Sequence, residues 1–345
     1  MDSKKSTQIF VTGGTGFVGS YLLRYLLHAG YANLKALKRK ESKMHLVADI
    51  ANRVEWVEGD VTDYESLEQG MNGVEVVFHC AAIVSFDSRD KKWLKRVNAD
   101  GTGNVVNAAL HNKVKKLIHV SSVAALGRSA NSNLIDETAK WEPGSLNSVY
   151  AISKFQAEME VWRGMEEGLP AVVVNPSIIL GSGEWKGSGS SKIFHLIGKG
   201  LPFYATGQNA FVDVRDVARF MMQFLDQELD GERYILASDN VNLKLLTSSI
   251  ALAMGKRPPW IHISPWIGWL AWRGDRIRSF FTGVRPVITR ETIENASHLW
   301  EYANDKSRAK GFTYIPLEQT IEETARQWLE SKGEKPAILP LYLPG

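Results

Sequence analysis

Short runs rich in valine, isoleucine and leucine alternate with helical patterns through the first half of the chain. The apolar runs lie at 9–13, 34–39, 54–60, 74–82, 116–124 and 171–179. Between the first two runs, leucines recur at the spacing of one helix face, at Leu22, Leu23, Leu26 and Leu27. Strands that alternate with amphipathic helices are typical of a parallel sheet covered by helices on both faces. The pattern therefore predicts an α/β fold with a doubly wound parallel sheet of the Rossmann type.

The pattern changes from about residue 178. A loop rich in glycine and serine spans 181–192, tryptophan-rich helical patterns follow, and a strand-then-helix pattern returns at 211–225. We expect a Rossmann domain over 1–177 to which 205–238 return, a smaller and mostly helical substrate-binding region formed by 178–204 and 239–330, and an extended tail over 331–345. Because the glycine- and serine-rich loop offers few side-chain contacts, we expect it to be mobile until a substrate orders it.

Composition excludes several classes of protein. With 345 residues, 44% hydrophobic and 23% charged, the chain can form one large domain or two unequal ones. Its net charge of +3 is too small to indicate a nucleic-acid partner, and no zinc-finger or RNA-binding signature is present. No window reaches about 18 apolar residues, so we expect no integral membrane segment. The polar start holds no apolar signal core and Cys80 is the single cysteine, so we expect a cytoplasmic protein without a disulfide or a metal site.

Three glycines, Gly13, Gly16 and Gly19, follow the first predicted strand and precede an amphipathic helix. Glycines at this spacing let the backbone approach a pyrophosphate, which then rests on the amides of the helix N-terminus. The residues at that N-terminus are Phe17 and Val18. Because a strand, a helix and a second strand surround the motif, it favours a dinucleotide site over a tight turn without a ligand.

The end of the second predicted strand indicates which dinucleotide is bound. Sites that prefer NAD place Asp or Glu there to bind the ribose 2′-hydroxyl. Here Lys38 and Arg39 occupy the place, and the first carboxylate comes at Glu41. A carboxylate repels a 2′-phosphate, whereas a guanidinium binds it with charge-assisted hydrogen bonds. The sequence therefore favours NADP over NAD, and the alternative is a solvated basic turn.

Three further strand ends supply candidate cofactor contacts. Asp60 and Val61 follow the third strand, where a carboxylate and a backbone amide could bracket the adenine, or could form a plain turn. Ala81 and Ala82 follow the fourth strand, where small side chains could let the dinucleotide lie flat, or could simply pack helix against sheet. Pro176, near the end of the last of these strands, completes the expected cofactor-binding set.

A tyrosine and a lysine, Tyr150 and Lys154, stand four positions apart in a stretch with a helical pattern. At this spacing their side chains share one face of a helix. Alone, such a pair is most often a packed tyrosine beside a solvated lysine. However, Ser121 and Ser122 end the fifth predicted strand, and strand ends at the carboxyl edge of such a sheet face the ligand crevice. Either serine can therefore meet Tyr150 in that crevice.

Serine, tyrosine and lysine in this order after a glycine-rich turn resemble the extended short-chain dehydrogenase/reductase family, which is the NAD(P)-dependent epimerase/dehydratase superfamily. Within this family the chain is most similar to the branch of dihydroflavonol reductases and 3β-hydroxysteroid dehydrogenases. The resemblance covers about residues 8–330 and extends to the stretches 97–109, 211–218 and 302–312.

The resemblance implies a role for individual residues. Ser122 matches the serine that orients the substrate, Tyr150 the acid/base and Lys154 its partner. Arg39 falls on the arginine that binds the 2′-phosphate. Asn98 matches an asparagine in the helix behind the site, although helix packing explains it equally well.

The implied chemistry is hydride transfer between the nicotinamide C4 and a carbonyl carbon, which the cofactor carries out. A free phenol has a pKa near ~10 and hardly ionises at neutral pH. An adjacent ammonium favours the phenolate, so we expect Lys154 to lower the pKa of Tyr150 toward the working range. Lys154 would also donate to the hydroxyls of the nicotinamide ribose.

The residues after Ser122 indicate which of the family's reactions this chain can carry out. The family's sugar-nucleotide dehydratases place Asp-Glu there, whereas this chain has Val123 and Ala124, which disfavours dehydration. The missing acid after the second strand counts against an epimerase, which keeps NAD bound. We expect an NADP-dependent oxidoreductase that reduces a carbonyl, or oxidises the alcohol, of a small apolar or cyclic substrate. The alternatives are a nucleotide-sugar epimerase of the same family and a non-catalytic NADP-binding sensor or scaffold.

Four tryptophans, Trp260, Trp266, Trp269 and Trp272, crowd one short stretch of the second region. They could form an apolar wall for a flat or lipid-like substrate, or a surface that touches membrane. The alternative is an ordinary helix that packs on the sheet. The expected partners are a small-molecule substrate and a second copy of the chain in a homodimer.

Overall fold

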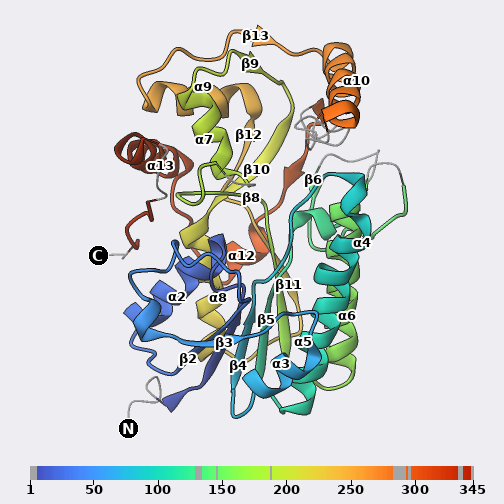
Figure 1. The fold of residues 1–345 in the computed structure, drawn as a ribbon, viewed down its shortest axis with the longest axis vertical. Coiled ribbons are helices and arrows are strands. Elements are labelled where there is room, and N and C mark those ends of the chain that lie inside the picture. The colour runs from blue at the N-terminus through green and yellow to red at the C-terminus, as the bar shows by residue number, and fades with distance from the viewer. Residues whose placement is uncertain are drawn as a thin grey trace.

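Seven parallel strands form the central sheet of the computed structural model, which describes residues 6–128, 134–144, 147–186, 189–282, 293, 297–332 and 337–342. The order across the sheet is β11-β7-β5-β4-β1-β2-β3, and helices lie on both sides of the sheet (Figure 1). The strands are β1 (Ile9–Thr12), β2 (Leu34–Lys38), β3 (Glu55–Glu58), β4 (Val76–His79), β5 (Lys116–Val120), β7 (Ala171–Pro176) and β11 (Arg233–Leu236). The chain order reverses between β1 and β4, which places the ligand crevice of such a sheet at their carboxyl ends. The predicted doubly wound Rossmann sheet is confirmed.

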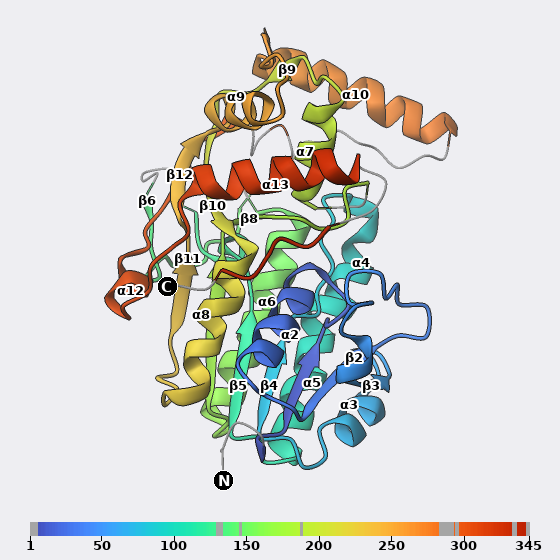
Figure 2. The same ribbon diagram turned by 90° about the vertical axis from the view of Figure 1, so that its left-hand side faces the viewer.

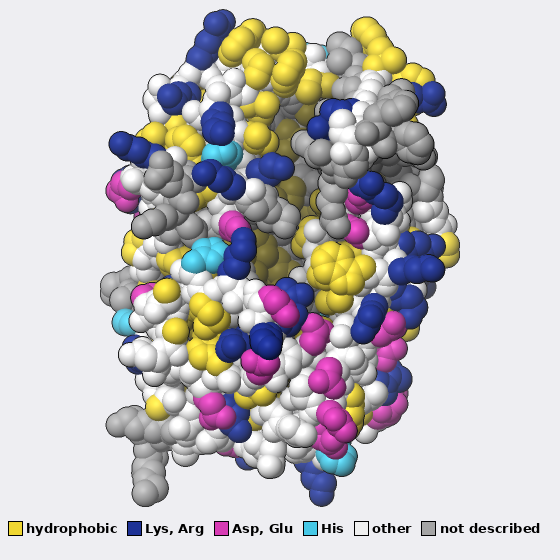
Figure 3. Space-filling model, in the orientation of Figure 1, with side chains coloured by type: hydrophobic (Ala, Val, Ile, Leu, Met, Phe, Trp, Pro, Cys, Tyr) yellow, Lys and Arg dark blue, Asp and Glu magenta, His cyan; other side chains and the backbone are white. Residues whose placement is uncertain are grey.

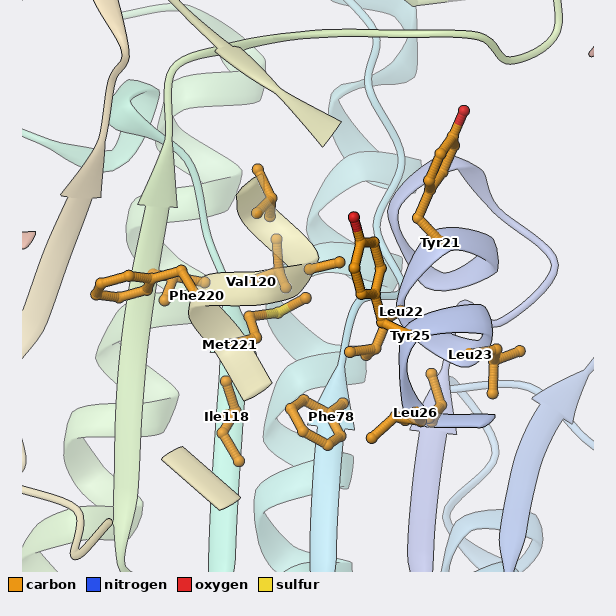
Figure 4. Packing of buried hydrophobic residues seen from close by; sticks show 14 of the residues in the cluster. Tyr21, Leu22, Leu23, Tyr25, Leu26, Phe78, Ile118, Val120, Phe220 and Met221 are labelled. Carbon is orange, nitrogen blue, oxygen red and sulfur yellow. The ribbon is translucent and has the colours of Figure 1, made fainter. Parts of the chain in front are cut away.

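Helices cover both faces of this sheet because successive strand residues point to opposite sides. Ile9 and Val11 of β1 belong to a core shared with α2 (Phe17–His28) and α8 (Val214–Asp226). Phe10, between them, belongs to the core shared with α3 (Tyr64–Gly70), α5 (Gly101–His111) and α6 (Val149–Glu166). In Figure 4, leucines of α2 and Phe220 and Met221 of α8 pack over the side chains of β4 and β5.

A second, smaller region lies beyond the carboxyl ends of the strands (Figure 2). Its sheet has the order β12-β10-β8. The elements of this region are β8 (Ile178–Leu180), α7 (Ser191–Gly198), β9 (Phe203–Tyr204), β10 (Gln208–Asp213), β12 (Asp239–Asn242), α9 (Leu243–Ala253), β13 (Ile261–His262), α10 (Pro265–Thr282) and α13 (Leu317–Ser331). The segment 205–238 therefore contributes β10 to this second sheet, and α8 and β11 to the Rossmann layers.

Short elements complete the described part of the chain. They are η1 (Ala51–Arg53), η2 (Ser88–Asp90), α4 (Lys91–Leu94), the π-helical η3 (Lys95–Asp100), η4 (Val123–Ala125), β6 (Leu134–Ile135), β14 (Glu301–Tyr302) and α12 (Asp305–Ala309). Residues 337–342 run without regular structure over α2, where the amides of Leu339 and Tyr342 donate to the hydroxyls of Tyr21 and Tyr25, both at 2.8 Å. None of the helices in the described ranges combines the length and hydrophobicity that a membrane span requires.

Candidate active site

The glycine-rich turn joins β1 to α2, and two of its glycines have no room for a side chain. Gly13 has a φ of +70°, and a Cβ there would lie 2.7 Å from the amide nitrogen of Ala81. A Cβ on Gly19 would lie 2.3 Å from the carbonyl oxygen of Gly13. These two glycines therefore let the start of α2 sit directly on the turn and on the end of β4.

The N-terminus of α2 is free to receive an anion. Its N-cap is Gly16, no side chain caps it, and its first turn carries no acidic residue. The amides of Phe17 and Val18 belong to the first turn, where backbone N–H groups have no partner within the helix. Such an N-terminus attracts phosphate through its amides and its dipole. The turn and the helix thus fit the pyrophosphate of a dinucleotide.

Two basic residues stand at the carboxyl end of β2, the strand that pairs with β1. Lys38 ends β2, and Arg39 follows it with an exposed side chain. The amide of Arg39 donates to the hydroxyl of Ser42 at 3.0 Å, which fixes the backbone there. Within the described ranges the Arg39 guanidinium forms no ion pair. An exposed cation at this strand end fits the 2′-phosphate of NADP.

The other predicted cofactor residues lie at the same sheet edge with different surroundings. The Asp60 carboxylate accepts from the amide of Thr62 at 2.8 Å, so one of its oxygens forms a local turn. Val61 is buried against Gly101. Ala81 is half-buried and Ala82 is exposed.

Pro176 is fully enclosed at the end of β7, where it pairs with Leu236 of β11. Asn98 is also buried, within the π-helical turn η3. Its side-chain oxygen accepts from the amide of Ile83 at 2.8 Å. Its side-chain nitrogen donates to the carbonyl of Ile83 and to the hydroxyl of Ser153, both at 2.9 Å. Asn98 therefore ties the loop after β4 to α6, in agreement with the helix-packing alternative.

A buried hydrogen-bond chain beneath the glycine-rich turn was not foreseen from the sequence. The amide of Ala81 donates to the hydroxyl of Thr12 at 3.2 Å, and that hydroxyl lies 2.7 Å from Nδ1 of His79. On the other side Nε2 lies 2.9 Å from the hydroxyl of Thr102, which donates to the carbonyl of Asn98. Burial, followed by the charge of Lys154, lowers the pKa of His79 to about 3, so this imidazole is neutral. The chain links β1, β4 and α5 at the crevice.

The predicted serine, tyrosine and lysine come together at the carboxyl end of β5. Ser148 caps α6 by accepting from the amide of Ala151 at 2.8 Å, which places Tyr150 in the first turn of the helix and Lys154 one turn later. Ser122 follows β5, and its side chain lies close enough to the Tyr150 hydroxyl to lower the pKa of that hydroxyl. The ammonium of Lys154 is buried and donates to the carbonyl of Val120 at 2.9 Å.

The pKa of Tyr150 differs from the lowered value expected from the sequence. Burial raises the pKa of Tyr150, and the hydrogen bond with Ser122 only partly opposes it, so the expected lowering is wrong for this structure. Burial also lowers the pKa of Lys154 to about 8, opposed by the negative charge of Glu158. Desolvation disfavours the charged form of each group. Near neutral pH the arrangement therefore holds a protonated phenol and, one helical turn further along α6, an ammonium.

Glu158, one turn beyond Lys154, is part of the site and was missed. Its carboxylate is buried, and burial raises its pKa. The side-chain amide of Asn175 donates to this carboxylate and also to the carbonyl of Ser122, at 3.0 Å for the latter. Arg233 lies 3.4 Å from the other oxygen of Glu158. The spacing of 150, 154 and 158 on one helix face was the available signal.

We expect Glu158→Gln to move the alkaline loss of activity to lower pH. Glu158 raises the pKa of Lys154 against the effect of burial, so removing its charge lets that pKa fall below about 8. Lys154 then loses its proton earlier as the pH rises, and the functions that need the ammonium disappear earlier. The pH dependence of NADPH affinity and of ketone reduction measures this shift. Glu166→Gln, at an exposed position of the same helix, is the control; equal profiles for both variants would contradict the assignment.

The glycine- and serine-rich loop does not lack side-chain contacts. The hydroxyl of Tyr21 donates to the carbonyl of Ser182 at 3.0 Å, and the Ser182 hydroxyl donates to Gln327 at 2.9 Å. Ser191 donates to the carbonyl of Gly181 at 3.0 Å, and Trp185 is buried in the core of the second region. The expectation of a contact-poor loop is therefore wrong for its described residues; 187 and 188 lie outside them.

The tryptophan-rich segment is not an ordinary helix that packs on the central sheet. Trp260, Trp266 and Trp269 are 51%, 65% and 46% exposed, and Trp272 is half-buried. In both ribbon views α10 lies at the end of the molecule farthest from the N-terminus, away from the central sheet. The alternative of a helix that packs on the sheet is therefore wrong.

Residues 9–237 match the family described as "NAD dependent epimerase/dehydratase family". The chain is 30% identical over 332 residues to a putative dihydroflavonol 4-reductase of a Synechocystis species, covering 94% of this chain and 95% of that protein. It is 29% identical over 265 residues to sterol demethylase protein B of Methylococcus capsulatus, covering 74% and 77%. A solved structure described as gox2253 is 30% identical, has a TM-score of 0.81, and is matched over 96% of this chain and 100% of its own.

The chain belongs to the NAD-dependent epimerase/dehydratase family, the extended branch of the short-chain dehydrogenases/reductases. It is an NAD(P)-dependent oxidoreductase. The resemblance seen in the sequence is confirmed.

Proposed function

We propose that the protein is an NADP-dependent oxidoreductase that reduces a carbonyl, or oxidises the corresponding alcohol, of a small apolar or cyclic substrate. One observation carries the proposal. Ser122, Tyr150 and Lys154 lie together at the carboxyl end of β5, on the sheet edge where the glycine-rich turn and α2 also begin. The residues proposed to bind the cofactor and those proposed to transfer the proton would therefore face one crevice.

The residues around the crevice would hold the cofactor at several points. The first turn of α2 would bind the pyrophosphate, and Lys38 and Arg39 the 2′-phosphate. Asp60, Val61, Ala81, Ala82 and Pro176 would line the remaining length of the dinucleotide. Lys154 has ammonium protons beyond the one given to Val120, and these would bind the nicotinamide ribose. When bound, NADPH supplies the hydride from its nicotinamide C4.

Tyr150 would donate the proton in the reduction. Its raised pKa keeps the phenol protonated at neutral pH, which is the form that can donate to a carbonyl oxygen. Ser122 would bind the same carbonyl oxygen. Its hydroxyl would also stabilise part of the negative charge that develops on the Tyr150 oxygen. The ammonium of Lys154 would stabilise the phenolate left after the transfer.

The residues around Ser122 support simple redox chemistry over elimination. Dehydration needs a further acid or base beside the substrate. Val123 is buried and Ala124 half-buried, and neither can exchange a proton. A reductase is therefore favoured over a dehydratase.

The second region supports an apolar substrate. We assign substrate binding to 178–204 and 239–330, whose described helices and strands lie mostly beyond the strand ends of the central sheet. Figure 3 shows a hollow with a largely hydrophobic floor in the upper half of this face. The relative named sterol demethylase protein B agrees with a cyclic, apolar substrate class.

A screen of NADPH consumption against aromatic, alicyclic and sterol ketones tests the proposal. We expect turnover with at least one cyclic ketone, and loss of that turnover in Tyr150→Phe. Tight NADPH binding without turnover of any ketone or alcohol would instead favour the non-catalytic sensor or scaffold. Conversion of a nucleotide sugar without net NADPH consumption would favour the epimerase.

We expect Arg39→Asp to weaken NADPH binding by about 10–100-fold, because a hydrogen bond to a charged group contributes about 1.5–3 kcal/mol. The introduced carboxylate also repels the 2′-phosphate, whereas NADH affinity should be little changed. Cofactor titration by fluorescence measures both affinities. Arg53→Asp makes the same charge change at an exposed position before β3, at the opposite edge of the sheet, and should alter neither. Equal NADPH and NADH affinities in the unmodified protein would contradict the NADP preference.

Two further expectations accompany the proposed activity. A homodimer is supported by Trp93 on α4 and Met159 on α6, which are large, exposed and carried by neighbouring helices. A cytoplasmic location is supported by the single cysteine, Cys80, since a chain with one cysteine can form no internal disulfide.

A further inference from the structure

The end of the molecule farthest from the N-terminus carries an unusual group of exposed apolar side chains. We call it the tryptophan surface: Trp260, Ile261, Trp266, Trp269 and Leu270, from β13, its approach and α10. Each of these side chains is at least 41% exposed. Large apolar side chains gathered in one exposed patch, as opposed to scattered singly, mark an interaction surface.

Cations stand beside the rings of this surface. The guanidinium of Arg273 lies 3.9 Å from the ring centre of Trp269, and that of Arg257 lies 4.4 Å from Trp260. The sequence from 256 to 282 contains five basic residues and one acidic residue, Asp275, which pairs with Arg278 at 2.6 Å. In Figure 3 hydrophobic side chains show in two places at the top of the molecule, over β13 and over α10, and Lys and Arg side chains lie beside both.

The chemistry of this surface selects one kind of partner. Tryptophan has an apolar body and a polar N–H, so it is favoured where hydrocarbon meets water. Arginine beside it can reach a phosphate while its stem stays on apolar surface. An amphipathic segment with aromatic residues on one side and cations alongside lies in the plane of a lipid interface. The described helices hold no membrane span, so such contact would be peripheral.

We propose that the tryptophan surface docks the protein on an anionic lipid bilayer. Trp260, Trp266 and Trp269 enter the boundary between headgroups and acyl chains, and Arg257 and Arg273 contact lipid phosphates. The docking stands on the exposure and charge of this end of the molecule, and it does not depend on the proposed reductase activity.

Vesicle flotation of the full-length protein tests the proposal. We expect binding to vesicles of phosphatidylcholine and phosphatidylglycerol in equal parts, and much weaker binding to phosphatidylcholine alone, with salt weakening the difference. The double variant Trp266→Ser/Trp269→Ser should lose at least about tenfold in affinity for the vesicles, because it removes two of the side chains that would insert into the bilayer. The double variant Arg257→Glu/Arg273→Glu should lose the preference for phosphatidylglycerol.

Leu329→Ser is the control, because Leu329 is an exposed large apolar side chain on α13, outside this surface and outside the helices assigned to the homodimer. It should bind vesicles as the unmodified protein does. Thermal unfolding and NADPH affinity verify that each variant is folded. Failure of the folded, unmodified protein to bind anionic vesicles would overturn the proposal. Equal binding by all variants would overturn it as well. So would a dimer, measured by light scattering, that only the Trp266→Ser/Trp269→Ser variant breaks, because the tryptophans would then lie between two copies of the chain.

Discussion

Replacing Tyr150 by phenylalanine is expected to lower the turnover of a ketone by about 10²–10⁴-fold, the usual contribution of a general acid. The substitution removes only the phenolic hydroxyl, whose pKa the neighbouring Ser122 side chain lowers. The ring and its edge-on contact with Phe86, at 5.8 Å between centroids, can remain. NADPH affinity should therefore change little, so the loss should fall on kcat.

Tyr314→Phe is a matched control for this variant. Tyr314 is a buried phenol whose hydroxyl lies 2.7 Å from the hydroxyl of a serine, Ser307. It lies in a different core, next to Phe312, so its loss should cost stability without affecting turnover. If Tyr150→Phe keeps most of the activity, Tyr150 is not the acid/base.

Replacing Lys154 by methionine should impair two steps together. The ammonium that would bind the nicotinamide ribose is lost, so NADPH affinity should fall by about 10–100-fold, in line with 1.5–3 kcal/mol for a charged hydrogen bond. The positive charge beside the phenol is lost as well, and removal of one such electrostatic group costs about 10²–10³-fold in kcat. Glu158 would also lose the charge of Lys154, which leaves Arg233 as its cationic neighbour.

Lys116→Met separates these effects from the loss of a structural lysine. Lys116 donates to the backbone carbonyls of Phe224, Leu225 and Gln227, at 2.7 to 3.0 Å, and lies at the start of β5, away from the crevice. Its substitution should lower stability and leave kcat and NADPH affinity unchanged. Unaltered NADPH affinity in Lys154→Met would show that Lys154 does not bind the cofactor.

Local patterns predicted the parts of this protein that depend on neighbouring residues in the chain. The strands, the glycine-rich turn and the four-residue spacing of Tyr150 and Lys154 are all properties of short stretches. The structure places them as expected because period, turn chemistry and helix geometry act locally. The pairing of β10 with β8 and β12 was not predictable in this way, since it depends on contacts between distant segments.

The pKa values and the loop show where local patterns fail. The pKa of Tyr150 depends on how completely the fold removes water from it, and this outweighs the effect of its neighbours in sequence. The role of Glu158, on α6, depends on Asn175 of β7 and Arg233 of β11, which are distant from it in the sequence. The loop at 181–192 is held by Tyr21 and by the buried ring of Trp185. Its glycines and serines alone gave no sign of these contacts.

The most direct test of the proposed activity is the transfer of deuterium from NADPH labelled at the nicotinamide C4. With a ketone accepted in the screen, we expect mass spectrometry to show one deuterium on the carbinol carbon of the product for each labelled hydride consumed. The product from Tyr150→Phe, if any forms, should carry the label at the same carbon, because the tyrosine moves only the proton. A product without deuterium, or a rearranged product formed while the cofactor returns to its starting state, would contradict a net carbonyl reduction.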